Sequence, residues 1–457
     1  MDGYDGAGDM NYPPPRPRRL LIVTYHFPPS AAVAVYRMLG FAQHLPRHGW
    51  QVGFVTPPLV PREPVDEALL QRVPPVTTVF TAPYPRGWLV RNPRRLLFDA
   101  VWFPRAWPAL RRAVQRFRPD AVLTSGPPHC VHSLGLWLQR RYRLPWVACL
   151  RDPWHTNGPR YKSWIPWARW ERFCERRVMA AADRVIANTP ITCADLQRAH
   201  PRQAHKMTFV TNGFDPERFP PPPPLRLQNE RLTIVHAGEI YSGRDPRPFF
   251  DALKMLEQSR PPSQAPVRCV LLGQSTEGRF DLDAAIAQRG LQGIVEVGGQ
   301  VPYAESLDAM ITADILLVLD TPRRRFSIPA KVFEYLGAAR PILALAEPDS
   351  DVAWCLRASG APHRIARALD TAQILQGLTE LRGGLAQGTL AHPPPEQLAK
   401  FTRARQAEIL AGHLTALVSG KLAAARAARF GSALANRDAL QRHPAAAPAS
   451  GPRYAGA

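Results

Sequence analysis

The chain has 457 residues, which is enough for two or three domains that each bury a core. Hydrophobic residues make up 45% of it and charged residues 21%, a balance that excludes a wholly disordered chain. The longest apolar runs, such as Ala31–Tyr36 and Ile315–Leu319, are far shorter than the ~20 residues of a membrane-spanning helix. No signal-peptide pattern opens the sequence, so we expect a cytoplasmic protein.

Positive charge is in large excess. The 58 Lys and Arg outnumber the 37 Asp and Glu, which gives a formal net charge of +21. Such an excess suits polyanionic partners, namely nucleic acid, anionic lipid headgroups or phosphorylated small molecules. The six cysteines lie far apart and form no C-x-x-C pair, which favours buried free thiols over a zinc site or a disulfide framework.

The first half of the chain alternates between strand and helix patterns. Residues 1–18 are rich in Gly, Asp and Pro and are expected to be disordered. Then Arg19–Thr24, a helix around Val35–Leu45 and Trp50–Thr56 form a βαβ unit, whose continuous apolar strands are typical of a parallel sheet buried on both faces. The alternation continues with strands at Ala121–Thr124, Pro145–Leu150, Arg184–Ala187 and Met207–Val210, and with helices at Cys130–Arg141 and Trp164–Ala182.

A proline-rich segment separates this half from a second one. Neither a helix nor a central strand can cross Pro220–Pro224, so residues 220–230 are predicted to be a stiff linker. The second βαβ series has strands at Leu232–Gly238, Val267–Leu272, Gly293–Val297, Asp314–Leu319 and Pro341–Leu345. A long helix is expected over residues 396–419, and a disordered basic tail over residues 420–457. The predicted fold is α/β: two doubly wound Rossmann-like domains, residues 19–219 and 231–395, that face a central cleft at the carboxyl ends of both sheets.

Short motifs lie at the predicted carboxyl ends of these strands. They are Tyr25–Ser30, Thr124–His129, Leu150–Trp154, Arg184–Thr189, Thr211–Asp215 and the Ser-Ile-Pro-x-Lys-x-Phe-Glu-Tyr stretch within Ser327–Pro341. In this order the set resembles glycosyltransferase family 4, which has the GT-B fold. The resemblance implies an enzyme that moves a sugar from a nucleotide-sugar to an acceptor hydroxyl with retention of configuration. It also implies a front-face mechanism, in which the leaving phosphate helps to deprotonate the acceptor.

The resemblance places the donor in the second domain. Glu334 corresponds to the glutamate that holds the nucleotide ribose, and a carboxylate suits this role because it can accept hydrogen bonds from two hydroxyls. A solvent-exposed glutamate on a helix surface is the alternative. Ser327 and Ile328 offer backbone N–H groups to the donor, and Lys331 is a further basic contact. Phe326 stands where the family usually has a second glutamate that contacts the donor sugar.

Positive charge is also needed beside the donor diphosphate, because the leaving group gains negative charge as it departs. Arg244 matches the family's phosphate-binding lysine, and it is also a catalytic candidate. The alternative is that Arg244 pairs with Asp245 and only fixes its turn. Glu239 stands where the family often has an arginine, a second departure for which Arg247, Arg325 or Lys331 would compensate.

The first domain supplies candidates for the acceptor side. His129 is predicted to face the cleft and to hydrogen-bond the donor sugar or the acceptor hydroxyl, with His132 as a rival. Asp152 is placed to orient an acceptor hydroxyl, unless it pairs with Arg151 or caps a turn. The acceptor or phosphate loop is predicted at Ser30, Ala31 and Ala32, where alanines replace the glycines that are usual in the family.

No D-x-D cluster follows a strand where a metal would bridge the diphosphate, so we expect no metal and no cofactor besides the nucleotide-sugar. Three alternatives remain for the function: a nucleotide-sugar epimerase of the same fold, a non-catalytic family member, or a basic nucleic-acid-binding protein. The sequence contains no helix-turn-helix, zinc-finger or RNP-like motif, so we expect no nucleic-acid partner.

A membrane surface is a further candidate partner. Trp88–Phe117 mixes arginines with aromatic residues, a composition that can seat a protein in anionic headgroups. Core aromatics with solvated arginines are the alternative, and Trp164, Trp167 and Trp170 are expected in the core because of their helical spacing. The acceptor would then be a glycan or a lipid-linked sugar of a glycolipid or polysaccharide precursor, and the protein peripheral at the inner face of the membrane.

Overall fold

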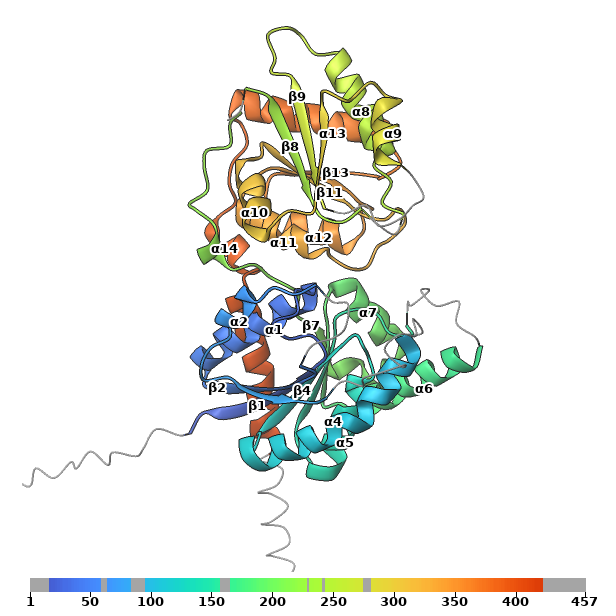
Figure 1. The fold of residues 1–457 in the computed structure, drawn as a ribbon, viewed down its shortest axis with the longest axis vertical. Coiled ribbons are helices and arrows are strands. Elements are labelled where there is room, and N and C mark those ends of the chain that lie inside the picture. The colour runs from blue at the N-terminus through green and yellow to red at the C-terminus, as the bar shows by residue number, and fades with distance from the viewer. Residues whose placement is uncertain are drawn as a thin grey trace, which may run out of the picture.

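The computed structural model describes residues 16–58, 64–83, 95–156, 165–227, 230–240, 243–273 and 281–421. These residues form two α/β domains, each built on one parallel sheet, that lie one above the other in Figure 1. The predicted terminal segments fall largely outside the described residues. Where they overlap, Arg18 already belongs to the first strand, because its amide donates to the carbonyl of Gly49 at 2.9 Å. Within these ranges no helix combines the length and apolarity needed to cross a bilayer.

The first sheet has seven strands in the order β3-β2-β1-β4-β5-β6-β7. The strands are β1 (Arg18–Thr24), β2 (Trp50–Thr56), β3 (Thr78–Thr81), β4 (Ala121–Gly126), β5 (Trp146–Leu150), β6 (Arg184–Ala187) and β7 (Met207–Phe209). The helices are α1 (Val33–His44), α2 (Ala68–Gln71), α4 (Arg95–Phe117), α5 (Val131–Tyr142), α6 (Ile165–Ala181) and α7 (Pro190–Ala199), with short 3-10 turns η1 (Leu45–His48), η2 (Pro201–Lys206) and η3 (Pro216–Arg218).

The second sheet has six strands in the order β10-β9-β8-β11-β12-β13. The strands are β8 (Leu232–Ala237), β9 (Val267–Leu272), β10 (Val295–Gly299), β11 (Ile315–Leu319), β12 (Ile342–Leu345) and β13 (His363–Ala366). The helices are α8 (Arg247–Gln258), α9 (Leu282–Ala287), α10 (Tyr303–Thr312), α11 (Ala330–Ala338), α12 (Asp351–Ser359), α13 (Thr371–Gln387) and α14 (Pro395–Ala399), followed by a helix over residues 403–421.

Continuous apolar strands bury both faces of each sheet, as the sequence predicts. In β1, Leu21 and Val23 belong to the core beneath α4, α5 and α6, while Leu20 and Ile22 belong to the core beneath α1. The reason is that successive side chains of a strand point to opposite faces, so a strand covered on both sides has to be apolar at every position.

The C-terminal segment is not the single helix predicted over residues 396–419. It forms the short helix α14, and after a break a helix over residues 403–421 crosses back to the first domain (Figure 1). Leu410 and Leu414 of this helix pack against Met38 and Phe41 of α1 in one buried core. The break lies where the chain passes between the domains, and there tertiary contacts outweigh helical periodicity.

Two chain segments cross between the domains side by side. Phe214 pairs with Thr402 in an isolated parallel bridge, and the amide of Arg403 donates to the carbonyl of Phe214 at 2.9 Å. A Cβ on Gly213 would lie 2.7 Å from the carbonyl oxygen of Phe401, so only glycine allows the two backbones to come this close.

Asp215 fixes this crossing with buried charge. Its carboxylate pairs with Arg403, with Arg72 at 3.0 Å and with His44 at 3.7 Å. Burial alone would raise the pKa of Asp215, but the hydrogen bond from His44 and the charges of Arg403 and Arg72 outweigh it and lower the pKa to about 2. The acid therefore stays charged at any physiological pH, and it holds α1, the segment after α2 and the C-terminal helix together.

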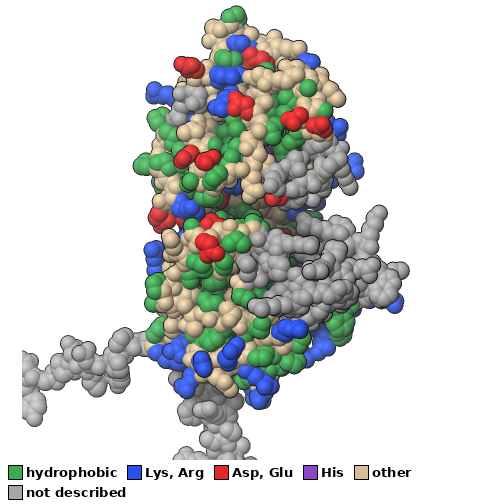
Figure 2. All heavy atoms as spheres, viewed as in Figure 1, with side chains coloured by type: hydrophobic (Ala, Val, Ile, Leu, Met, Phe, Trp, Pro, Cys, Tyr) green, Lys and Arg blue, Asp and Glu red, His purple; other side chains and the backbone are tan. Residues whose placement is uncertain are grey.

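The domains carry their charge unevenly. In Figure 2, Lys and Arg side chains gather at the lower end of the first domain. That end lies away from the junction with the second domain, so part of the excess positive charge is remote from the cleft.

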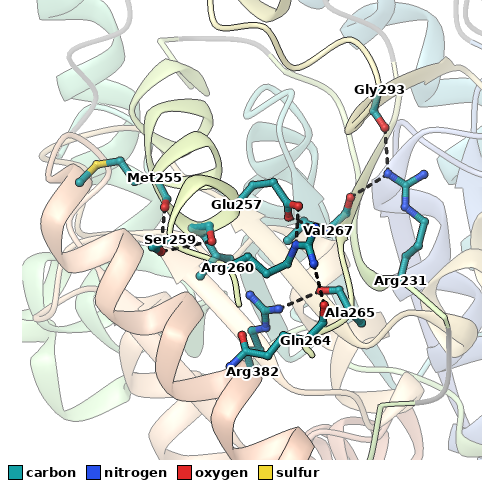
Figure 3. A network of polar contacts seen from close by, with 11 residues as sticks. Arg231, Met255, Glu257, Ser259, Arg260, Gln264, Ala265, Val267, Gly293 and Arg382 are labelled. Atoms are coloured by element: carbon teal, nitrogen blue, oxygen red, sulfur yellow. Dashed lines mark hydrogen bonds and ion pairs between the residues drawn. The ribbon is translucent and has the colours of Figure 1, made fainter. Parts of the chain in front are cut away.

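A polar network fastens the amino edge of the second sheet, opposite to the cleft (Figure 3). Arg231 donates to the carbonyls of Val267 and Gly293 at 3.0 and 2.9 Å, which ties the starts of β8, β9 and β10 together. Glu257 accepts from the amide of Val267 at 3.1 Å and from Arg260 at 2.5 Å. This edge is thus occupied by structural contacts, whereas the carboxyl edge carries the candidate site.

Replacing Leu410 with Ala is expected to destabilise the first domain by about 2–5 kcal/mol, because it removes a buried side chain and leaves a cavity under α1. Urea unfolding followed by circular dichroism measures the change. The matched control is Glu408→Ala, an exposed residue of the same helix, which should shift the unfolding free energy by no more than about 0.5 kcal/mol. Equal effects of the two variants would show that the helix contributes little to the core.

Candidate functional site

Glycines bring two loops together at the carboxyl edge of the second sheet. The amide of Gly238, just after β8, donates to the carbonyl of Leu272 at 2.7 Å. Gly273 has a φ of +126°, and a Cβ there would lie 2.3 Å from the carbonyl oxygen of Gly238. Only glycine fits such an approach, so bare backbone opens the loop that leads to Arg244.

Arg244 lies within this loop, where it is 6% exposed. Its guanidinium donates to the carbonyl of Glu239 at 3.0 Å. Asp245 forms an ion pair with Arg247 at 2.7 Å, which gives this carboxylate a cation other than Arg244 and leaves Arg247 little freedom to replace it. A buried guanidinium at a strand end favours binding of an anionic group, because few waters compete for it.

An acidic residue, Asp320, follows β11 near Arg244. Burial raises the pKa of Asp320, the residue after β11, and the hydrogen bond from the amide of Thr321 and the charges of Arg324 and Arg244 oppose the rise only in part. The charges of Asp320 and Arg244 are thus close enough to interact at this edge of the sheet.

Glu334 is 8% exposed, so it is not the solvated helix residue that the sequence left open. Its carboxylate pairs with Lys331 at 2.7 Å, one turn earlier on α11, and accepts a hydrogen bond from the Tyr303 hydroxyl at 3.3 Å. Lys331 also lies over the Tyr303 ring, 5.4 Å from its centre. The structure thus brings two predicted donor residues into direct contact and adds Tyr303, which no motif had indicated.

The surroundings of Glu334 include the first domain. It lines a small cavity of about 30 Å³ together with Tyr36 and Arg37 of α1 and Asn212 of the loop after β7. Arg37 donates to the carbonyl of Thr211 at 2.6 Å and so fixes this loop. The Thr211–Asp215 motif was a signal for this contact, but the sequence could not show that it would face Glu334.

Tyr36 and Tyr303 meet across the domain junction. Their rings are stacked with centres 6.2 Å apart, and Arg218 lies over Tyr303 at 4.4 Å. Burial and the nearby negative charge of Glu334 raise the pKa of Tyr303. Its hydroxyl therefore remains a hydrogen-bond donor to Glu334 at neutral pH.

The loop before α11 has an unusual backbone. Ser327 has a φ of +88°, and its amide donates to the carboxylate of Asp351 at 2.9 Å, so this N–H is not available to a donor. Ile328 is buried in the second domain's core. Phe326, which occupies the place of the family's second glutamate, lies under the guanidinium of Arg324 at 5.5 Å.

In the first domain, three rings stack at the end of β4. His129 lies parallel to Trp154 with centres 4.9 Å apart, and His132 lies behind it at 5.7 Å. A Cβ on Gly126 would lie 2.8 Å from the ring of His132 and 3.0 Å from that of His129, so glycine makes room for the stack. His132 is fully buried and hydrogen-bonds Thr124 at 2.8 Å, which gives it a structural role and leaves His129 as the candidate.

Burial lowers the pKa of His129 to about 4, despite the opposing charge of Asp152. The imidazole is therefore neutral near pH 7, and it can donate or accept a hydrogen bond without carrying charge. Asp152 is half-buried in the loop after β5. Arg151 donates to the carbonyl of Gly126 at 3.2 Å and so ties this loop to the His129 loop.

A buried carboxylate supports the far side of the Asp152 loop. Glu175 of α6 accepts from the amides of His155 and Thr156 at 2.7 and 3.0 Å, and from the His200 ring at 3.0 Å. Burial alone would raise the pKa of Glu175, but the hydrogen bonds from His200 and Thr156 lower it. The loop that carries Asp152 and Trp154 is thus anchored on a charged acceptor.

The loop Ser30–Ala32 uses its polar groups internally. The amide of Ala32 donates to the Ser30 hydroxyl at 3.2 Å, and the amide of Ala31 donates to the carbonyl of Pro64 at 2.8 Å. These two amides are not free to meet a phosphate in this conformation.

Metal ligands are not clustered in the described ranges, where no group of three or more His, Cys, Asp or Glu side chains could hold an ion. The six cysteines all lie in the described residues and form no disulfide, and Cys149, Cys193, Cys269 and Cys355 are buried.

The low pKa of His129 has a consequence for stability. An unfolded histidine has a pKa of about 6.5, so between pH 4 and 6.5 the unfolded chain binds more protons than the folded one. Stability should therefore fall as the pH is lowered through this range, and His129→Gln should flatten the slope. Urea unfolding at several pH values measures it. His205→Gln, an exposed histidine in η2, is the control, and an NMR titration of His129 near pH 6.5 would contradict the assignment.

Part of the chain resembles a known protein family. Residues 34–218 match the model of Glycosyltransferase Family 4. The D-inositol 3-phosphate glycosyltransferase of Kineococcus radiotolerans is 26% identical over 183 residues, a match that covers 38% of this chain and 41% of that protein. The chain thus spans about two fifths of the length of this curated relative.

Solved structures share the whole architecture. Sucrose-phosphate synthase from Thermosynechococcus elongatus has a TM-score of 0.56 and 16% identity, over 91% of this chain and 100% of that one. HepE from Anabaena, solved in complex with UDP-glucose, has a TM-score of 0.52 and 15% identity, over 89% and 99%. At such identities the likeness shows the fold alone. Residues 34–218 thus resemble glycosyltransferase family 4, and the two α/β domains together have a GT-B-like fold.

Proposed function

We propose that this protein transfers a sugar from a nucleotide-sugar donor to an acceptor hydroxyl with retention of configuration. The observation that carries the proposal is the buried Glu334 at the domain junction, held by Lys331 and Tyr303. A carboxylate held in this way is preorganised to accept hydrogen bonds from a ribose, and a family member's second domain is where the nucleotide is expected. HepE, which has the same fold, was solved with UDP-glucose, so a UDP-sugar is the first donor to test.

Arg244 supports the reaction from the other end of the donor. It is buried at the end of β8, next to the bare backbone of Gly238 and Gly273. A fixed cation in a site of low polarity stabilises the charge that grows on the departing diphosphate, and this lowers the barrier to transfer. The phosphate itself would take the acceptor proton, so no nucleophile from the protein is required.

His129 and Asp152 serve the acceptor side in this proposal. His129 is neutral, so it can orient a sugar hydroxyl without a competing charge, while Trp154 fixes the plane of its ring. Asp152 follows β5 on the adjacent loop, and its carboxylate can accept the acceptor's hydroxyl proton in a hydrogen bond. Epimerase chemistry on the same fold is the second candidate, since Phe326 replaces a glutamate that usually contacts the donor sugar.

Two variants test the donor site. Glu334→Gln should weaken donor binding by about 1.5–3 kcal/mol, the contribution of a hydrogen bond to a charged group. Arg244→Ala should lower kcat by about 100-fold, because it removes a charge that acts mainly in the transition state. Calorimetry and release of UDP from a panel of UDP-sugars measure the two effects.

Arg247→Ala is the matched control for Arg244, because Arg247 lies in the same loop but half its side chain is exposed and it pairs with Asp245. The Arg247→Ala variant should bind the UDP-sugar with the affinity of the wild type and have the same kcat. Normal kinetics for Arg244→Ala would mean that Arg244 only shapes its loop. Interconversion of free UDP-sugars in the absence of any acceptor would identify an epimerase instead.

The acceptor belongs to the same proposal: a glycan or lipid-linked sugar presented at an anionic membrane surface. Trp102 does not support the membrane role assigned to Trp88–Phe117, because it is fully buried and donates to the carbonyl of Ala82 at 3.3 Å. Residues 88–94 lie outside the described residues. Trp107 is 38% exposed and stacks on Trp137 of α5. Thus part of the stretch is core and part is surface.

The stronger membrane surface lies on the outer side of α4, α5 and α6. Trp170 and Phe173 of α6 are 54% and 46% exposed, so the prediction that Trp170 is a core residue is wrong. Their rings are 5.7 Å apart, and Arg177 lies over Phe173 at 5.2 Å. The exposed arginines of these helices are Arg105, Arg111, Arg112, Arg116, Arg140, Arg141, Arg169, Arg172, Arg176 and Arg177. Aromatic side chains among arginines match an anionic headgroup layer in both polarity and charge.

The double variant Trp170→Ala, Phe173→Ala should reduce binding to vesicles that contain phosphatidylglycerol even at low salt, because the insertion of aromatic rings is not screened. The wild-type protein should bind vesicles that contain phosphatidylglycerol more strongly than neutral phosphatidylcholine vesicles. Its binding to the anionic vesicles should weaken as salt shortens the Debye length to ~8 Å. Co-sedimentation measures both. Met255→Ala, an exposed apolar residue of the second domain, is the control. Equal binding to anionic and neutral vesicles would indicate a soluble acceptor.

A further inference from the structure

One carboxylate of the second domain lies in the junction with the first. Asp351 is the first residue of α12 and is fully buried. One carboxylate oxygen accepts from the amide of Ile191 in the first domain at 3.0 Å, and the other accepts from the amide of Ser327 in its own domain at 2.9 Å. This side chain therefore connects a helix of one domain with the loop that precedes α11 in the other.

The contact with Ile191 completes a helix end. Pro190 is the first residue of α7 and has no N–H, so Ile191 carries the first free amide of that helix. Thr189, the N-cap, accepts from the amide of Thr192 at 3.4 Å and leaves the Ile191 amide to Asp351. A carboxylate also suits this place because a helix N-terminus is partly positive. The N-terminus of α7 thus offers a hydrogen-bond donor to the buried carboxylate of Asp351.

The contact with Ser327 holds a strained turn. Ser327 has a φ of +88°, a region that costs a non-glycine residue on the order of 1–3 kcal/mol. Asp351 holds this turn through two hydrogen bonds. Its own amide donates to the carbonyl of Arg325 at 2.7 Å, and its carboxylate accepts from the amide of Ser327. Without these two hydrogen bonds, the turn would relax towards ordinary dihedral angles.

The turn leads directly into the donor site. Ile328 is buried after it, and α11 then carries Lys331 and Glu334. Nearby, Phe209 of β7 and Trp354 of α12 pack edge to face across the same junction with centres 5.6 Å apart, so α12 is seated on the first domain by more than one contact.

We propose that Asp351 is a positioning residue that couples the seating of the two domains to the shape of the donor loop 325–328. When α7 is in place, its N-terminus fixes the carboxylate, and the carboxylate holds Ser327 in its strained conformation. When the domains separate, Asp351 loses its partners in the first domain, the amide of Ile191 and the side chain of Thr189, and the turn is held less firmly. By reciprocity, a donor that needs this loop shape favours the seated arrangement of the domains. The donor half of this inference rests on the proposed function, whereas the contact between the domains does not.

Asp351→Asn tests this coupling, because the asparagine side chain has only one oxygen that can accept a hydrogen bond and presents N–H groups on its other side. It therefore cannot accept from the amides of Ile191 and Ser327 in the same way as the carboxylate. Hydrogen–deuterium exchange of the free protein, read by mass spectrometry, should show the peptides around Ile191 and Ser327 losing protection together, by about tenfold for one lost hydrogen bond to a charged group. Peptides from β1 and β8 should be unchanged. The matched control is Asp349→Asn, an exposed acid of the same loop that pairs with Arg325 at 2.9 Å, and it should leave both peptides protected.

A second substitution tests whether the turn is what Asp351 holds. Asp351→Asn should raise the KM for a UDP-sugar about tenfold, with a smaller change in kcat. Adding Ser327→Gly should restore most of that KM, because glycine adopts a positive φ without strain. The peptide around Ile191 should nevertheless stay unprotected in the double variant, since the contact between the domains is still missing.

The outcomes are distinguishable. Loss of protection around Ser327 alone, with Ile191 unchanged, would overturn the coupling. Failure of Ser327→Gly to restore the KM would overturn the role of the turn. If wild-type protein binds no UDP-sugar, the donor assignment fails, but the exchange experiment still decides whether Asp351 links the two domains.

Discussion

The buried charge of Asp215 is the constraint on which the rest of the molecule depends. It lies where the chain passes between the domains twice, and its partners come from three separate segments: His44 at the end of α1, Arg72 after α2, and Arg403 at the start of the C-terminal helix. Loss of either arginine would leave a buried carboxylate without one of its charged partners, which destabilises a protein by about 3–5 kcal/mol. The crossing therefore has one permitted arrangement. This sets where α1 and the C-terminal helix lie relative to the second domain.

Two carboxylates of the second domain, Glu334 and Asp351, lie at the junction with the first domain. Glu334 lies beside Tyr303, which stacks on Tyr36 of α1, and Asp351 accepts from the amide of Ile191 on α7. The first contact is adaptable, because a stacked ring pair tolerates sliding, while the second depends on hydrogen-bond geometry. A domain movement would therefore disturb Asp351 before it separated the rings, which is a suitable arrangement for sensing closure.

Positively charged side chains of this protein lie in two settings, one buried between strand ends and one exposed on helices. Burial lowers the pKa to about 4 for both His129, at the end of β4, and His236, in β8, so these histidines are neutral. In the proposed donor site, positive charge would therefore come from arginine and lysine. Outside, the exposed arginines of α4, α5 and α6 form a surface on the first domain. In the proposed function, the first set would act at short range on a bound ligand, whereas the second would attract large anionic surfaces and be weakened by salt.

The sequence by itself determined the architecture and pointed to the residues of the proposed donor site. Continuous apolar strands, helical periodicity between them and the ordered motifs predicted two parallel α/β sheets, because these signals are local and repeat along the chain. Glu334 and Lys331 could be proposed together because both lie in one short motif, on one helix, that resembles glycosyltransferase family 4. The tertiary structure decided everything that depends on which distant segments meet.

It buried Trp102 and exposed Trp170, although both lie in amphipathic helices, because periodicity shows that a helix has an apolar face but not how far that face is covered. Likewise it gave His132 a structural hydrogen bond and stacked His129 on Trp154. It broke the last predicted helix where Phe214 pairs with Thr402, and it gave Asp351 a partner 160 residues away in the sequence. No local pattern encodes such contacts, because they form only when both domains have folded and their carboxyl edges face each other.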